Sequence, residues 1–113
     1  EGKDFKEENI YKVFGTSINY LIGNKILEVP DFIKIDVDGI EHLILKGATS
    51  YLKNEKIKSI QVELNENFEE QYNSAEKILK EANFILKSKV LASSSGSKSD
   101  RFSKMFNCVF ERK

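Results

Sequence analysis

Two stretches of the chain place charged or amide side chains within the hydrophobic alternation of a β-strand. The polar members are Lys34, Asp36 and Asp38 in residues 32–38, and Gln61, Glu63 and Asn65 in residues 57–65. A carboxylate in such a position can take a proton from a hydroxyl group or bind a cation. A buried charge without a partner is costly, so these side chains need mutual pairing, solvent or a ligand.

The elements around these stretches predict how they are positioned. Asp38-Gly39 reads as a tight turn, and a helical apolar stripe follows it over residues 40–52, divided at Gly47. A strand, a crossover helix and a second strand form a unit whose strands are parallel neighbours. Ligands of open α/β sheets bind at the carboxyl ends of such strands, so we expect the two polar sets to line one patch there.

The remaining segments predict further elements on both sides. Upstream we expect a short strand over residues 10–14 and a short helix after a cap at Ser17 or Asn19. Downstream we expect a helix over 66–82, a left-handed stop at Asn83, and an antiparallel hairpin of strands 84–91 and 105–111. The intervening residues 92–103 are rich in Ser, Gly and Lys, which predicts a mobile loop, with acceptor recognition as the functional alternative.

Composition restricts the class of protein. The 113 residues fit one domain, and we interpret residues 1–113 as a single-domain fragment cut from a longer protein. Lys and Arg number 18, as do Asp and Glu, so nothing favours nucleic acid or a membrane surface as partner. A single cysteine, Cys108, reads as a core residue and fits a cytoplasmic protein, and no apolar run is long enough to span a membrane.

The motifs resemble those of the FkbM family of S-adenosylmethionine-dependent methyltransferases. The residues that carry the resemblance are Lys34-Ile35-Asp36-Val37-Asp38-Gly39-Ile40-Glu41, then Leu45-Lys46-Gly47-Ala48, then Val62-Glu63. The resemblance covers about residues 10–111, with Asn19 where the family usually has an acid. It implies an α/β fold, the carboxyl-terminal half of a Rossmann-like methyltransferase domain, with parallel strands, a terminal antiparallel hairpin, and the last strand inserted between the second and third.

The same resemblance implies what the chain does. The family binds S-adenosylmethionine through a Gly-rich loop, and no Gly-x-Gly occurs in this sequence. We therefore expect the parent protein to O-methylate a hydroxyl of a sugar, glycan or other small molecule, and the fragment alone to be inactive and to bind no S-adenosylmethionine.

Individual residues are assigned roles on this basis. Asp36 and Glu63 are the candidate catalytic residues, Lys34 and Glu41 the candidate substrate-binding residues, and no metal site is assigned. Simpler interpretations stay open: an internal ion pair for Lys34 with Asp36 or Glu63, and a helix-start acid for Glu41. His42 is interpreted as an exposed polar residue.

Two other functions remain open. Asp36-Val37-Asp38 is an Asp-x-Asp at a strand end, as in metal-dependent glycosyltransferases, where two carboxylates hold a divalent cation. The chain is alternatively a non-enzymatic association module. We also expect strand 32–38 to have an open edge, which either mediates self-association or is covered by the segment before Pro30.

Overall fold

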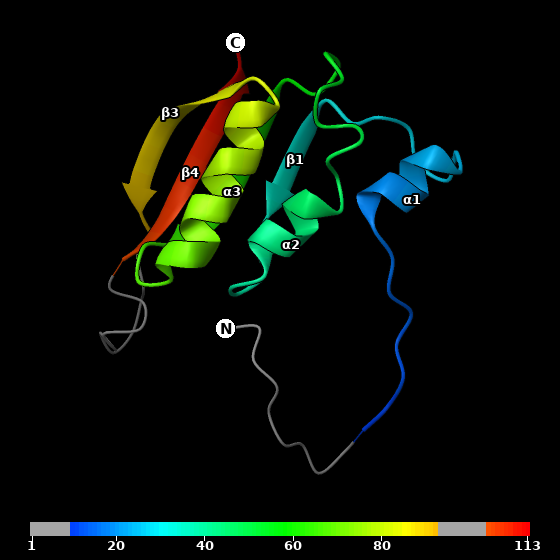
Figure 1. The fold of residues 1–113 in the computed structure, drawn as a ribbon, viewed down its shortest axis with the longest axis horizontal. Coiled ribbons are helices and arrows are strands. Elements are labelled where there is room, and N and C mark those ends of the chain that lie inside the picture. The colour runs from blue at the N-terminus through cyan, green and yellow to red at the C-terminus, as the bar shows by residue number, and fades with distance from the viewer. Residues whose placement is uncertain (1–9, 93–103) are drawn as a thin grey trace.

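The computed structural model describes residues 10–92 and 104–113 (Figure 1). Residues 93–103, which include most of the expected loop, lie outside the described residues. In chain order the described elements are α1 (Ile18–Gly23), β1 (Phe32–Ile35), α2 (Glu41–Lys46), β2 (Ser59–Asn65), α3 (Glu69–Glu81), β3 (Phe84–Leu91) and β4 (Met105–Arg112).

The four described strands form one mixed sheet in the order β1-β2-β4-β3. β1 and β2 are parallel, with Lys34 opposite Gln61, as the crossover through α2 requires. β4 lies between β2 and β3 and is antiparallel to both. The predicted parallel pair, the terminal hairpin and the inserted last strand are therefore all confirmed, and the chain is a mixed α/β protein.

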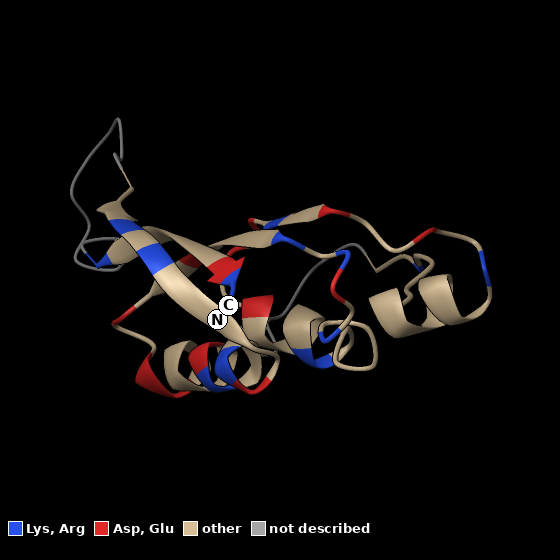
Figure 2. Ribbon diagram, turned by 90° about the horizontal axis from the view of Figure 1, so that it is seen from above, with Lys and Arg blue, Asp and Glu red and all other residues tan. Residues whose placement is uncertain are grey.

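The helices α2 and α3 cover the same face of this sheet (Figure 2). The apolar residues of the strands point toward them, and Leu45, Ile60, Val62, Leu79, Phe84 and Phe110 are almost fully buried. Cys108 belongs to this core, as predicted, and its burial raises the pKa of the thiol to about 11. The opposite face carries the half-buried polar residues of β2, including Gln61 and Glu63.

The helix α1 is short and attached to the end of α2. The Ser17 hydroxyl caps it by accepting a hydrogen bond from the Tyr20 N–H at 3.1 Å, as one of the two predicted caps. Asn19 instead bonds to the segment after α2: its N–H donates to the Gly47 carbonyl, and its side-chain oxygen accepts from the Ser50 N–H. Asn19 therefore joins α1 to the segment after α2 through both its backbone and its side chain.

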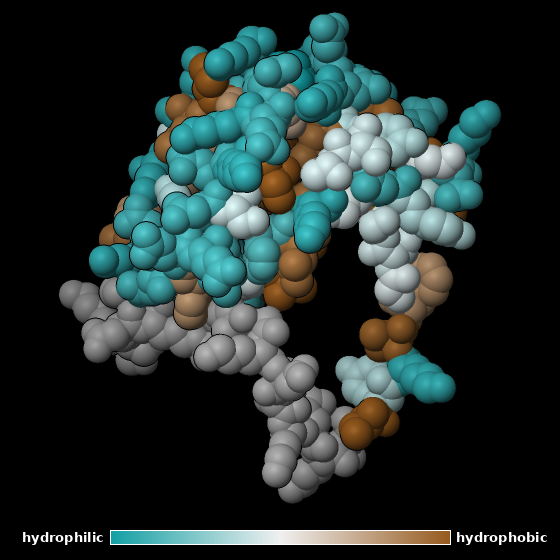
Figure 3. Space-filling model, in the orientation of Figure 1, coloured by the Kyte–Doolittle hydropathy of each residue, from teal (hydrophilic) through white to brown (hydrophobic). Residues whose placement is uncertain are grey.

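The expected strand over residues 10–14 is wrong. These residues are extended without strand pairing, and Ile10, Tyr11, Val13 and Phe14 are 76–92% exposed. They run away from the sheet (Figure 1), and their apolar side chains stand out at the lower right of the surface in Figure 3. An apolar segment forms a strand only where a neighbouring strand pairs with its backbone N–H and C=O groups, and no described strand does so here.

Several expected boundaries also change. The strand expected over 32–38 ends at Ile35, because the backbone turns at Asp38 and Gly39, which have φ values of 52° and 109°. The helix expected over 40–52 ends at Lys46, with Gly47 as its C-cap, and that expected over 66–82 occupies Glu69–Glu81. Asn83 has a φ of 69°, which confirms the left-handed stop.

The Arg112 side chain ties the end of β4 to three other parts of the fold. Its guanidinium donates to the carbonyls of Leu52, Asn54, Ile57 and Ala82, and it stacks on the Phe84 ring at 4.4 Å. Five N–H groups in a planar fork suit such a convergence of carbonyls. The carboxyl-terminal strand is therefore fastened at the end of the sheet opposite the candidate site.

Candidate functional site

The turn between β1 and α2 is shaped around the carboxylate of Glu41. This carboxylate accepts hydrogen bonds from the Val37 N–H at 3.3 Å and from the Gly39 N–H at 3.2 and 3.0 Å. Glu41 is only 6% exposed, and it belongs to the first turn of α2. An acid at this place is favoured by the helix dipole, and here it also satisfies the backbone donors of the preceding turn.

The carboxyl groups of Asp36 and Glu63 are brought together where β1 and β2 end. A hydrogen bond with Asp36 is the largest influence on Glu63 and raises its pKa, and burial adds to the effect. The negative charges of Asp36, Asp38 and Glu41 raise it further, so the pKa of Glu63 reaches about 7. Of the Lys34, Asp36 and Glu63 side chains that were expected in one patch, Asp36 and Glu63 therefore lie together.

The Lys34 ammonium is not part of this hydrogen-bonded pair. Lys34 lies opposite Gln61 in the β1–β2 register and is exposed. The ion pairs within the described ranges join Lys80 to Glu76 and Lys89 to Glu66, and Lys34 forms none with Asp36 or Glu63. The internal ion pair that was left open for Lys34 is therefore wrong, and without it the repulsion among the acids raises the Glu63 pKa.

A small cavity lies beside this pair, between the first turns of α2 and α3. It has a volume of about 10 Å³, and Asp38, His42, Glu63, Asn65, Phe68 and Tyr72 are among its lining residues. That volume holds roughly one water-sized group. Asp38 from the first predicted polar set and Glu63 and Asn65 from the second therefore line one recess. Lys34, Asp36 and Gln61 are not among its lining residues.

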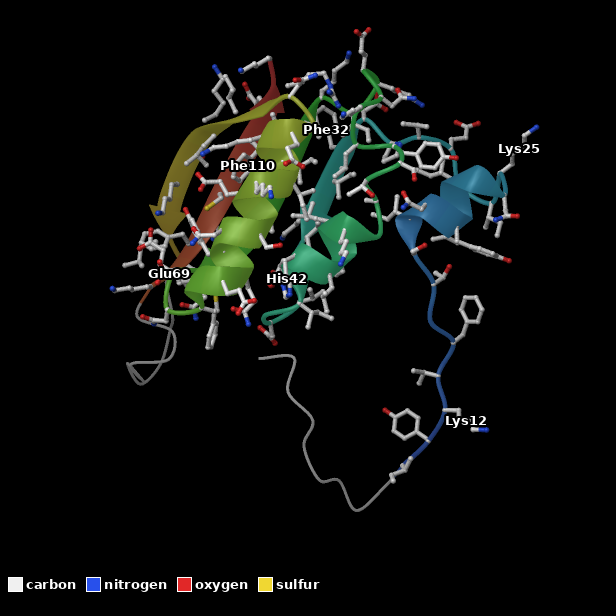
Figure 4. All side chains as sticks on the ribbon, viewed as in Figure 1. Lys12, Lys25, Phe32, His42, Glu69 and Phe110 are labelled. Carbon is white, nitrogen blue, oxygen red and sulfur yellow. The ribbon has the colours of Figure 1, made fainter. Side chains whose placement is uncertain are left out.

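His42 is a site residue that the sequence did not indicate. It was expected to be exposed, but it is half-buried, and its Nδ1 atom is buried without a hydrogen-bond partner in the described structure. Figure 4 places it at the lower end of α2, on the side toward α3. Its burial depends on α3, which starts more than twenty residues later, so no local pattern around His42 signals it.

Lys89 from β3 contacts Tyr72, one of the residues that line the cavity. Its ammonium pairs with the Glu66 carboxylate and lies 5.0 Å from the Tyr72 ring centroid and 4.5 Å from that of Phe106. The Glu66 carboxylate is the main reason that the Lys89 pKa is raised. A cation held between two rings and a carboxylate restricts Tyr72, a residue that lines the cavity.

Two further features of the described residues concern ligand binding. No group of three or more His, Cys, Asp or Glu residues in this part of the chain has metal-binding geometry. The N–H groups of Val37 and Gly39, at the one described turn with a left-handed glycine, are bonded to Glu41. No described helix is long and apolar enough to cross a membrane.

Comparison with known families decides the relationship. Residues 3–86 match the model of the methyltransferase FkbM domain. The chain belongs to the FkbM methyltransferase family. No curated protein and no solved structure matches it. The matched range contains the turn at Asp38, the Asp36–Glu63 pair and the lining residues from α2 and α3, so the candidate site lies within the FkbM domain.

Proposed function

We propose that this FkbM chain supplies the acceptor side of an S-adenosylmethionine-dependent O-methyltransferase, with a hydroxyl of a sugar, glycan or other small molecule as acceptor. The observation that carries the proposal is the Asp36–Glu63 pair. Transfer of a methyl group to a hydroxyl oxygen releases the hydroxyl proton, and a base must take it. A carboxyl group with a pKa of about 7 is half-ionised at neutral pH, where a general base is most effective.

In this proposal Glu63 is the base that takes the hydroxyl proton, and Asp36 stabilises the protonated form of Glu63. The carboxylate of Glu63 accepts the hydroxyl proton, and the resulting carboxylic acid donates a hydrogen bond to the Asp36 carboxylate. The negative charges of Asp36 and Asp38 make the Glu63 carboxylate a stronger base than an isolated one, because each disfavours its ionised form. Lys34, on the same face of the sheet and exposed, is available to contact a more distant part of the acceptor.

We further propose that the cofactor binds to a different part of the methyltransferase fold, so that residues 1–113 form a carboxyl-terminal, Rossmann-like half that is inactive alone. Three observations support this division. The sequence contains no Gly-x-Gly, and the turn after β1 is already bonded to Glu41. The outer edge of β1 is also free of strand pairing within the described residues, as expected of a strand that has a second neighbour in the whole domain.

The division is tested by calorimetric titration of the 113-residue chain with S-adenosylmethionine. No heat of binding is expected. A stoichiometric heat at micromolar affinity would show that a cofactor site is present in this chain, which would defeat the division but leave the base pair to be tested separately.

The catalytic assignment is tested in a polypeptide that joins this chain to the cofactor-binding half that the proposal requires. Asp36→Asn should lower kcat by on the order of a hundredfold and leave cofactor affinity unchanged, as expected for loss of general-base assistance. Asp31→Asn is the matched control, because Asp31 is an exposed aspartate just before the other end of β1. Equal activity of the two variants would remove Asp36 from the mechanism.

A further inference from the structure

Glu41 occupies a place from which it acts on the candidate base without being available to a substrate. Both carboxylate oxygens are bonded to backbone N–H groups, one to Val37 and Gly39 and the other to Gly39. The residue is 6% exposed, whereas Asp36, just before the bonded turn, and Asp38, within it, are exposed. A ligand would have to displace these hydrogen bonds to reach the Glu41 oxygens.

The turn that Glu41 holds has an unusual backbone. Asp38 has a φ of 52°, a left-handed conformation that a non-glycine residue adopts at a cost, and Gly39 follows with a φ of 109°. Such a conformation persists only when its surroundings fix it. The hydrogen bonds from Val37 and Gly39 flank Asp38, so Glu41 is the side chain that fixes it.

We propose that Glu41 is a positioning residue of the FkbM site, which holds the Val37–Gly39 turn so that the Asp36 and Asp38 carboxylates face Glu63. This inference rests on the proposed role of Glu63 and extends it. It also replaces a substrate contact as the role of Glu41. Glu41 favours the protonated form of Glu63 in two ways. Its own negative charge lies near Glu63, and the turn that it holds keeps the Asp36 and Asp38 carboxylates near Glu63 as well.

The test is Glu41→Gln in the 113-residue chain, read by carbon-13 NMR titration of the Glu63 side-chain carboxyl. Glutamine removes the negative charge and has a single acceptor oxygen, whereas both carboxylate oxygens of Glu41 accept hydrogen bonds from the turn. The Glu63 titration midpoint should fall by roughly half a unit or more, because one repelling charge is lost and the Asp36 hydrogen bond is less firmly held. Amide exchange at Val37 and Gly39 should become at least about tenfold faster, since a charge-assisted hydrogen bond is lost at each.

Two further variants separate this role from a structural one. Glu41→Asp keeps the charge on a shorter side chain, so its Glu63 midpoint should lie between those of the wild type and Glu41→Gln. This variant also serves as the test if Glu41→Gln does not fold. Glu55→Gln is the matched control, because Glu55 is an exposed glutamate in the loop before β2, and it should change neither readout.

The outcome that overturns the inference is specific. If Glu41→Gln is folded and the Glu63 midpoint and the two amides behave as in the wild type, Glu41 does not position the pair. That result would leave the proposed base standing. A wild-type Glu63 midpoint at the ordinary value of a glutamate would instead defeat the proposed base itself, so the two failures are distinguishable.

Discussion

The Asp36 and Glu63 side chains share a hydrogen bond across the carboxyl ends of β1 and β2. Two carboxyl groups form such a bond only when one of them carries a proton, and with a pKa of about 7 Glu63 carries that proton in about half of the molecules at neutral pH. The O-methylation proposed above requires a base, because the acceptor hydroxyl loses a proton during methyl transfer. The proposed function assigns to this pair the proton that an acceptor hydroxyl would release.

The first prediction concerns stability and pH. Glu63 has a pKa of about 7 in the folded chain and 4.5 as its ordinary value, so the folded state binds a proton more tightly than the unfolded state. This contribution to stability is fully present below pH 4.5 and is lost as the pH rises through 7. The melting temperature of Glu63→Gln should depend less on pH in that window than that of the wild type. If the melting temperatures of the two proteins change with pH by the same amount between pH 4.5 and about 8, the account is contradicted.

The second prediction concerns the attachment of β4. Arg112→Lys keeps the charge, but a single ammonium group cannot reach the four carbonyls that the guanidinium bonds, from Leu52 to Ala82. Carbonyls left without donors should lower the free energy of unfolding by roughly 2 kcal/mol, measured by urea denaturation. Lys77→Arg, at an exposed position of α3, is the control. A loss no larger than that of the control would mean that the Arg112 bonds contribute nothing net.

The third prediction concerns the open edge of the sheet. In the part of the chain that is described, β1 pairs with β2 alone, and Phe32 at its start is 71% exposed. Coverage of this edge by a strand from the described residues before Pro30 is not observed. We therefore expect the isolated chain to self-associate through β1, with a sedimentation coefficient that rises with concentration.

A charge at the edge should weaken that association. Phe32→Asp should shift the association to at least about tenfold higher concentration, because it places a charge on the pairing surface. Val90→Asp is the control, since Val90 is 61% exposed on the strand at the opposite edge. If the control has the same effect as Phe32→Asp, the association does not use β1.

Much of the fold could be predicted because its signals are local. Alternation in residues 32–38 and 57–65, the Asp38-Gly39 turn and the stripe of α3 each depend on neighbouring residues, and each is observed. The place of β4 between β2 and β3 is different, because it came from resemblance to a family. The meeting of Asp36 with Glu63 followed from the parallel pairing of two strands that are each polar on one face.

What could not be predicted depends on contacts between distant segments. Residues 10–14 are rich in apolar residues, as strands often are, but they have no strand partner. β1 stops early because Glu41 draws the next residues into a turn. His42 is half-buried because α3 packs beside it, and Arg112 bonds carbonyls that lie thirty or more residues away in sequence. A sequence pattern shows which face of an element is apolar, but not which other element covers it.

The most direct test of the central claim is a carbon-13 NMR titration of the Glu63 carboxyl in the wild type and in Asp36→Asn. The account predicts a wild-type midpoint near 7, and a midpoint in Asp36→Asn that moves toward 4.5, since the variant loses both the hydrogen-bonding carboxylate and its charge. A wild-type midpoint near 4.5 that Asp36→Asn leaves unchanged would show that the two groups do not share a proton. The site would then lack the base on which the proposed function rests.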